Sequence, residues 1–134
     1  AGTGFINSSP DPDGFIRQAA LLIRYQDKVY PSLALEAARL YALASELPVE
    51  TAPLEQINTI VGVTVGNTRI NTDLYGRVLI PYRGPARSFP YISAVDVLHG
   101  AVDKTLLKDA VVFVGTSAVG HADLRSTHIG NHFA

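Results

Sequence analysis

Short apolar runs alternate with turn residues in the first part of the chain, and this pattern predicts β-strands. Residues 11–14, Asp-Pro-Asp-Gly, predict a tight hairpin turn, because the proline fixes φ early and the glycine accepts a positive φ later. Residues 21–25 form a strand-like run of mostly apolar side chains. Residues 26–28 then turn the chain toward a short extension at residues 29–30.

The strongest helical pattern covers residues 32–47. Ser32 is placed to cap this helix, and Pro31 and Pro48 bracket it. Its polar positions form one narrow stripe: Ser32, Glu36, Arg39 and Glu46. The remaining face is apolar, so we expect the helix to be covered on most sides. Residues 54–57 are left as a connection, because prolines interrupt both the helical and the strand pattern there.

Three short apolar runs follow, and they predict an antiparallel meander. The runs are residues 60–65, 68–72 and 77–82. Gly66-Asn67 is a two-residue hairpin signal between the first two, and residues 73–76 join the second to the third. The sequence therefore predicts that the third strand lies beside the second.

The last third of the chain predicts a short helix followed by a buried strand. Ser93 and Asp96 match a capping box, and Gly100 stands where the helix would end. Residues 103–107 predict one further helical turn. Residues 110–115 are continuously apolar, which is typical of a strand buried on both faces. A helix before such a strand suggests an α/β crossover.

Together these elements predict one α/β or α+β domain, with a mixed β-sheet, an antiparallel meander and flanking helices. The 134 residues suit a single core, and 47% apolar with 17% charged residues is the balance of a globular domain. The net charge is −1 with scattered basic residues, which argues against nucleic acid or an anionic membrane surface as a partner.

The sequence also limits the chemistry and the context of the chain. Cysteine is absent, which excludes disulfides, thiolate metal sites and cysteine nucleophiles within the chain. No apolar run approaches the roughly 20 residues that a membrane span needs. With no initiator Met or signal peptide at its start, we expect the chain to be a fragment of a longer protein.

Candidate ligand-binding residues follow the predicted strand at residues 110–115. Thr116 and Ser117 would lie at its carboxyl end, where donors often face a ligand crevice, and His121 is a further ligand-binding candidate just after them. Ser117 could instead be a hydrolase nucleophile with His121 and Asp123, but Val119 occupies a position where the G-x-S-x-G motif requires glycine. The structural alternative is a turn of small residues that bends the chain after a core strand.

Asp123 and Arg125 would share one face of an extended segment and could grip a polar ligand together. Arg83, which follows the predicted meander, could meet an anionic ligand or could pair with a carboxylate such as Asp123. The favoured alternative is that both pairs anchor loops through structural hydrogen bonds. The histidines near the C-terminus have no metal-ligand spacing, so we predict no metal site. We also predict no cofactor and, because the nucleophile elbow is incomplete, no catalytic residue.

Four stretches of the chain, taken in order, resemble the second type of CHASE domain, the cyclase/histidine kinase-associated sensory extracellular family. They are residues 4–7 through 11–14 with Arg17, residues 30–37, residues 82–85 with Phe89-Pro90, and residues 112–115 through Asp123, Arg125 and Thr127. The resemblance implies that the chain corresponds to the C-terminal half of that domain.

It also implies an extracytoplasmic, periplasmic sensor of a small-molecule or protein cue. Through its own transmembrane helices the sensor would be joined to a cytoplasmic adenylate or guanylate cyclase, or to a histidine or serine/threonine kinase. On this reading the fragment is not an enzyme, and a homodimer is possible. The alternatives are a small α/β hydrolase using Ser117 and a structural dimerisation module.

Overall fold

The computed structural model describes residues 2–54, 57–85, 88–115, 125–127 and 130–133. Burial is described for these residues except 57–58 and those beyond 115. The chain divides into two compact units, Ala1–Ile80 and Pro81–Ala134. Each unit is described by itself.

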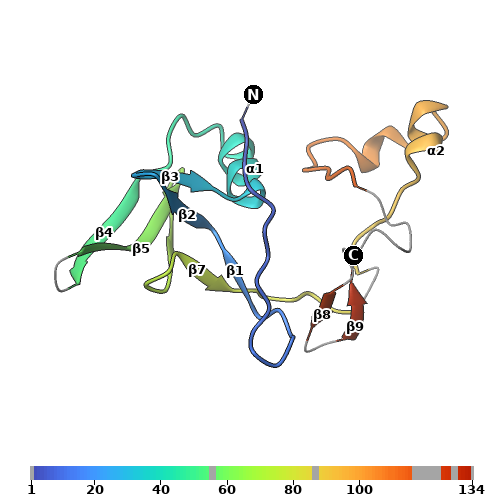
Figure 1. Ribbon diagram of the computed structural model, residues 1–134. Coiled ribbons are helices and arrows are strands. Elements are labelled where there is room, and N and C mark those ends of the chain that lie inside the picture. Colours follow the sequence, from blue (N-terminus) through green and yellow to red (C-terminus); the bar gives the residue numbers. More distant parts are fainter. Residues whose placement is uncertain (1, 55–56, 86–87, 116–124, 128–129, 134) are drawn as a thin grey trace. The chain divides into compact units, whose positions relative to one another are not determined.

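The first unit begins with the predicted turn and a hairpin (Figure 1). The amide of Gly14 donates to the carbonyl of Asp11 at 2.8 Å, which confirms the tight turn. Strand β1 is Gln18–Ala20, and β2 (Leu22–Tyr25) pairs antiparallel with β3 (Lys28–Pro31). Gln26 and Asp27 both have positive φ, as a two-residue hairpin turn with the right-handed strand twist requires. The predicted strand at residues 21–25 and its reversal are confirmed.

Helix α1 is Leu33–Tyr41 and is capped as predicted, because the Ser32 hydroxyl accepts a hydrogen bond from the Leu35 amide at 3.2 Å. The prediction that it continues to residue 47 is wrong. Leu43 has a φ of 53°, and the amides of Leu43 and Ala44 donate back to the carbonyls of Leu40 and Arg39. This Schellman motif ends the helix although no glycine marks its end.

The expectation that the protein covers the apolar face of the helix on most sides is also wrong. The helix buries Leu35 together with Glu36, one of the residues of the polar stripe. Leu40 and Tyr41 are exposed, at 46% and 64%. The polar stripe therefore faces the protein in part, because Glu36 has a partner there that satisfies its charge.

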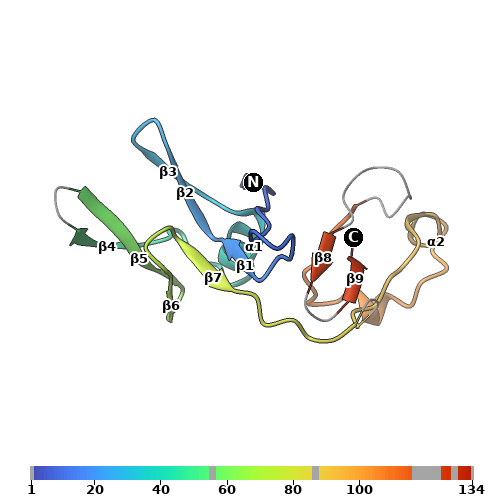
Figure 2. The ribbon, with the colours of Figure 1, turned by 60° about the horizontal axis from the view of Figure 1, so that its bottom comes forward.

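A three-stranded antiparallel sheet follows, in the order β4-β5-β6 (Figure 2). Strand β4 is Val49–Leu54, β5 is Ile57–Val65 and β6 is Thr68–Asn71. The Gly66-Asn67 hairpin is confirmed, with φ of 57° at Gly66. The sequence did not predict β4 because of its prolines, but Pro53 is tolerated since β4 is an edge strand in the sheet.

The predicted third strand of the meander pairs elsewhere. Strand β7 (Arg77–Leu79) lies antiparallel to β1, with Ala19 opposite Val78, and not beside β6. The tight turn between Asp73 and Arg77 redirects the chain after β6, since the Asp73 amide donates to the Arg77 carbonyl at 2.9 Å. The three-stranded meander is therefore wrong, although all of these strands are antiparallel to their neighbours.

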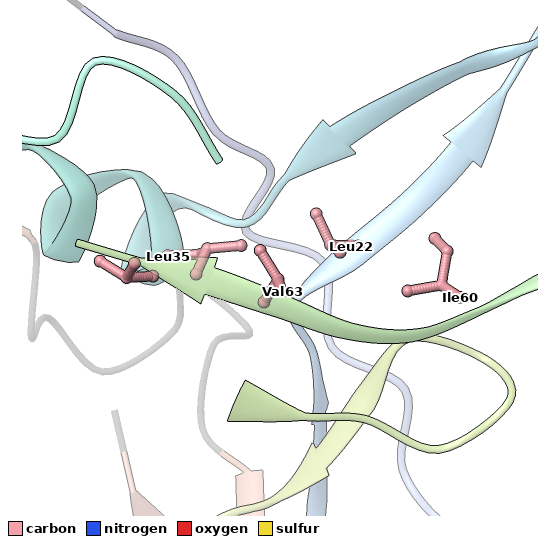
Figure 3. Close-up of a cluster of buried hydrophobic side chains, with 5 residues drawn as sticks. Leu22, Leu35, Ile60 and Val63 are labelled. Atoms are coloured by element: carbon pink, nitrogen blue, oxygen red, sulfur yellow. The ribbon is translucent and has the colours of Figure 1, made fainter. Parts of the chain in front are cut away.

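The hydrophobic core of the first unit joins the helix to the strands. Leu35 of α1, Leu22 of β2 and Val63 of β5 point toward one another, with Ile60 beside them (Figure 3). Leu22 and Val63 are 2% and 0% exposed. Full burial of such side chains contributes about 1.5–3 kcal/mol each, so this cluster holds α1 against β2 and β5.

In the second unit, α2 is Ala94–Leu98 and the 3₁₀ turn η1 is Lys104–Leu106. Gly100 ends α2 as predicted, with a φ of 69° and its amide donating to the Val97 carbonyl. The predicted capping box is wrong in its chemistry, because Ser93 is the N-cap but its side chain forms no cap hydrogen bond. The further turn at residues 103–107 is confirmed by η1.

The predicted buried strand at residues 110–115 is also wrong for this structure. No strand is formed at residues 111–115, and Phe113 and Val114 are 62% and 89% exposed. A continuous apolar run becomes a buried strand only where neighbouring strands and covering layers exist, and the described residues supply none. A hairpin of β8 (Arg125–Thr127) and β9 (Gly130–Phe133) closes the described chain.

The fold class is as predicted, a mixture of helix and sheet in which antiparallel strands dominate. Among the described residues, parallel pairing is confined to the bridge between Phe5 and Ser32. The α/β crossover expected before residues 110–115 is not formed, because that run is not a strand.

Candidate functional site

Arg83 is the one predicted site residue whose side chain the structure describes. It is exposed, in a segment without regular structure that follows Tyr82. The preceding residue, Tyr82, is half-buried, and burial raises the pKa of its phenol above the ordinary value. Within the described part of the chain, Arg83 forms no ion pair.

The remaining predicted site residues cannot be placed with it. Thr116, Ser117, His121 and Asp123 lie outside the described residues. For Arg125 the backbone is described, in β8, but the side chain is not. The pairing of Arg83 or Arg125 with Asp123 therefore stays a prediction.

The described residues contain a different candidate site, an open groove of about 580 Å³. It lies between the loop that follows α1 and the β5–β6 hairpin turn. The residues that line it are Ala42, Leu43, Ala44, Ser45, Glu46, Pro48, Val65, Gly66, Asn67 and Thr68. Its volume falls within the range of small-molecule sites. The sequence analysis did not find it, because its two walls come from segments about 20 residues apart.

Local structure explains why the groove forms. The Schellman motif turns the chain away from the helix at Leu43, and the Thr64 amide donates to the Pro48 carbonyl at 3.0 Å. Those contacts fix both ends of the loop. On the other wall, a Cβ at Gly66 would stand 3.6 Å from the Ala42 side chain, so the hairpin turn lies directly against the end of the helix.

The groove lining mixes apolar and polar residues and carries one charge. Val65 is buried in the hydrophobic core, at 8% exposure, whereas Leu43 is 91% exposed in a left-handed conformation that glycine normally occupies. Glu46 is the charged residue among those that line it. The C-terminal end of α1, which carries a partial negative charge, lies at the same place.

Arg39 holds this loop from the helix side. Its Nη1 donates to the Ala44 carbonyl at 2.6 Å, while Nε and Nη2 donate to the two carboxylate oxygens of Glu36. The Arg39 guanidinium holds the pKa of Glu36 below its usual range. The positive charge of Arg39 is thus balanced by Glu36, and Arg39 serves to position residues 44 and 45.

A second constellation fixes the β1–β7 ribbon. Asp73 accepts from the amides of Tyr75 and Arg77 through Oδ1 and from the Arg77 Nε through Oδ2, each at 2.8 to 2.9 Å. The Arg77 guanidinium lies 4.9 Å from the centre of the Tyr75 ring. The buried Thr59 hydroxyl donates to the Leu74 carbonyl at 2.6 Å, which ties this turn to β5.

The same arrangement occurs at residues 13–17. Asp13 accepts from the Phe15 amide and pairs with Arg17, whose guanidinium lies 5.2 Å from the Phe15 ring centre. Asp11 adds a second carboxylate at 2.9 Å. The two turns lie at opposite ends of the ribbon and have the shared pattern Asp-x-aromatic-x-Arg. Every charge in them is paired within its own turn, so we assign them a structural role.

Two further features bear on function. The described residues contain no group of three or more metal-ligating side chains. In the same part of the chain, no helix has the length and apolar character that a membrane crossing requires.

The comparisons with known proteins give the class of the protein. The sequence matches the family model for the CHASE2 domain over residues 1–133. The chain therefore belongs to the CHASE2 family, an extracellular sensory domain family found in signalling receptors. This confirms the resemblance seen in the sequence. Searches of curated proteins and of solved structures gave no match.

Proposed function

We propose that this chain is the extracytoplasmic sensory part of a bacterial transmembrane receptor. The single observation that supports it best is the CHASE2 match over residues 1–133, nearly the whole chain. The sensor binds a small-molecule or protein cue on the periplasmic side. It passes the signal through the receptor's own transmembrane helices to a cytoplasmic adenylate or guanylate cyclase, or to a histidine or serine/threonine kinase.

The coding sequence on either side of the chain tests this proposal. We expect three hydrophobic spans after residue 134, each of about 20 residues, and then a catalytic cyclase or kinase domain. An uninterrupted polar sequence with no spans on either side would contradict it. Hydrophobic spans that are not followed by a cyclase or kinase domain would contradict only the proposed output and not the sensory role.

A sensory family argues against the hydrolase alternative, because CHASE2 domains are sensory and not catalytic. A serine-reactive fluorophosphonate probe tests this directly on the purified chain. We expect no labelling. Labelling that the Ser117→Ala variant abolishes, with retained folding by circular dichroism, would restore Ser117 as a nucleophile.

A second observation favours a role in association between copies of the chain. In the second unit no side chain whose burial is described is buried, and the run at residues 111–114 is 46–89% exposed. Exposed apolar runs of this kind mark protein contacts. We propose that the receptor forms a homodimer, and sedimentation velocity at increasing concentration tests it. A monomer throughout the accessible range would contradict it.

A further inference from the structure

We infer that the groove between α1 and the β5–β6 turn binds a small organic cation with an apolar part, such as a primary alkylamine. This inference rests on the proposed sensory function, because it assigns a cue site and a cue chemistry to the sensor. None of the predicted site residues lines this groove.

The first support is the state of Leu43. A left-handed conformation costs a non-glycine residue about 1–2 kcal/mol, and a 91% exposed leucine gains nothing from burial. The conformational cost would vanish with glycine, which is the usual residue at this position of a Schellman motif. Strained residues of this kind cluster where a protein contacts a ligand. Leu43 supplies an exposed apolar side chain to the lining of the groove.

The second support is the balance of charge. Glu46 lines the groove, and the Glu46 carboxylate has no ion pair within the described residues. The nearby cations are already matched, since Arg39 pairs with Glu36 at 2.6 Å and Arg69 pairs with Glu50 at 2.6 Å. The Glu46 carboxylate therefore leaves a negative charge in the groove lining, and this charge favours a cation.

The third support is the set of apolar residues in the lining. Leu43, Pro48 and Val65 are among the residues that line the groove, and Leu43 is 91% exposed whereas Val65 is buried at 8%. A groove of about 580 Å³ is large enough for a ligand of moderate size. A ligand with an ammonium group near Glu46 and an alkyl chain along the exposed Leu43 and Pro48 uses all three features.

The test uses the 134-residue chain and two matched probes, n-hexylamine, which is cationic at pH 7, and neutral n-hexanol. Binding is measured at low ionic strength from the amide chemical shifts of residues 65–68. We expect saturable binding of n-hexylamine, which weakens by about tenfold in Glu46→Gln and weakens several-fold in Leu43→Gly. Asp96→Asn, which removes an exposed carboxylate in the second unit, is the matched control and should change nothing.

Equal binding of n-hexanol and n-hexylamine, or binding unaffected by Glu46→Gln, would overturn the inference. So would the lack of any saturable shift. These outcomes would not decide the sensory proposal. That proposal is tested separately, by the spans and the output domain encoded beside the chain. Amine binding without such spans would leave the groove assignment in place and refute the receptor.

Discussion

Arg39 donates to both carboxylate oxygens of Glu36, from Nε at 2.8 Å and from Nη2 at 2.6 Å. The bidentate pair lies within one turn of α1, and its remaining donor holds the Ala44 carbonyl. A Cβ at Gly2 would collide with the Glu36 carboxylate, so the N-terminal segment lies directly against the pair at Gly2. One ion pair therefore connects that segment, the helix and the groove loop.

The first prediction concerns this pair. Arg39→Lys keeps the charge but cannot form the bidentate contact and the loop contact together. We expect a lower thermal midpoint and faster hydrogen exchange at the Ala44 amide, which is bonded to the Arg39 carbonyl. Arg83→Lys, at an exposed position, is the control. Equal exchange at Ala44 in both variants would show that Arg39 does not hold the loop.

The second prediction concerns the end of α1. Leu43→Gly should stabilise the chain by about 1 kcal/mol, because glycine relieves the left-handed strain. Leu43→Ala is the control, since it removes the exposed side chain but keeps the strain. Urea denaturation measures both. A loss of stability in Leu43→Gly would mean that the leucine side chain has a stabilising contact.

The third prediction separates backbone strain from steric collision. Gly76 and Gly14 both have positive φ, but a Cβ at Gly76 would meet the Leu22 carbonyl oxygen at 2.8 Å, whereas no described atom lies within 4 Å at Gly14. We expect Gly14→Ala to cost about 1 kcal/mol and Gly76→Ala about 3 kcal/mol. Equal losses in chemical denaturation would mean that the β1–β7 ribbon yields to the added methyl group.

The fourth prediction concerns acid stability. Burial alone would raise the pKa of Asp73, but the amides of Arg77 and Tyr75 and the Arg77 guanidinium lower it below the ordinary value. A depressed folded pKa gives stability that is present above the unfolded value, about 3.9, and lost as the pH falls through the folded value. Asp73→Asn should therefore flatten the fall in stability below about pH 4. If chemical denaturation shows the same fall in stability below about pH 4 in Asp73→Asn as in the unmodified chain, the prediction is contradicted.

Local signals in the sequence predicted the parts of the fold that depend on local chemistry. Ser32 caps α1 and Gly66-Asn67 forms a hairpin, because each needs only a side chain or a backbone conformation within a few residues. The pairing of β7 with β1 joins residues about 60 positions apart. The hydrophobic pattern of a strand does not indicate which distant strand it pairs with. The end of α1 was missed because Leu43 takes a conformation that its residue type disfavours.

The candidate site was harder to predict for a related reason. The apolar pattern at residues 110–115 indicates burial but says nothing of which strands provide it, so the site residues placed after it depended on an unformed strand. No sequence motif marks the residues that line the groove, so the sequence could not predict it. The repeated Asp-x-aromatic-x-Arg pattern at Asp13 and Asp73 was visible in the sequence, and comparing those two segments would have revealed the paired turns.

The most direct test of the central claim is the location of this domain in intact cells. The chain has no cysteine, so Leu43→Cys, at a 91% exposed position, adds one accessible thiol to the full-length receptor. A small, membrane-impermeant maleimide should label this variant in intact cells well above the unmodified receptor. Val63→Cys, at a fully buried position, should need denaturation first. Labelling of Leu43→Cys only after the cytoplasmic membrane is broken would place the domain inside the cell and contradict the account.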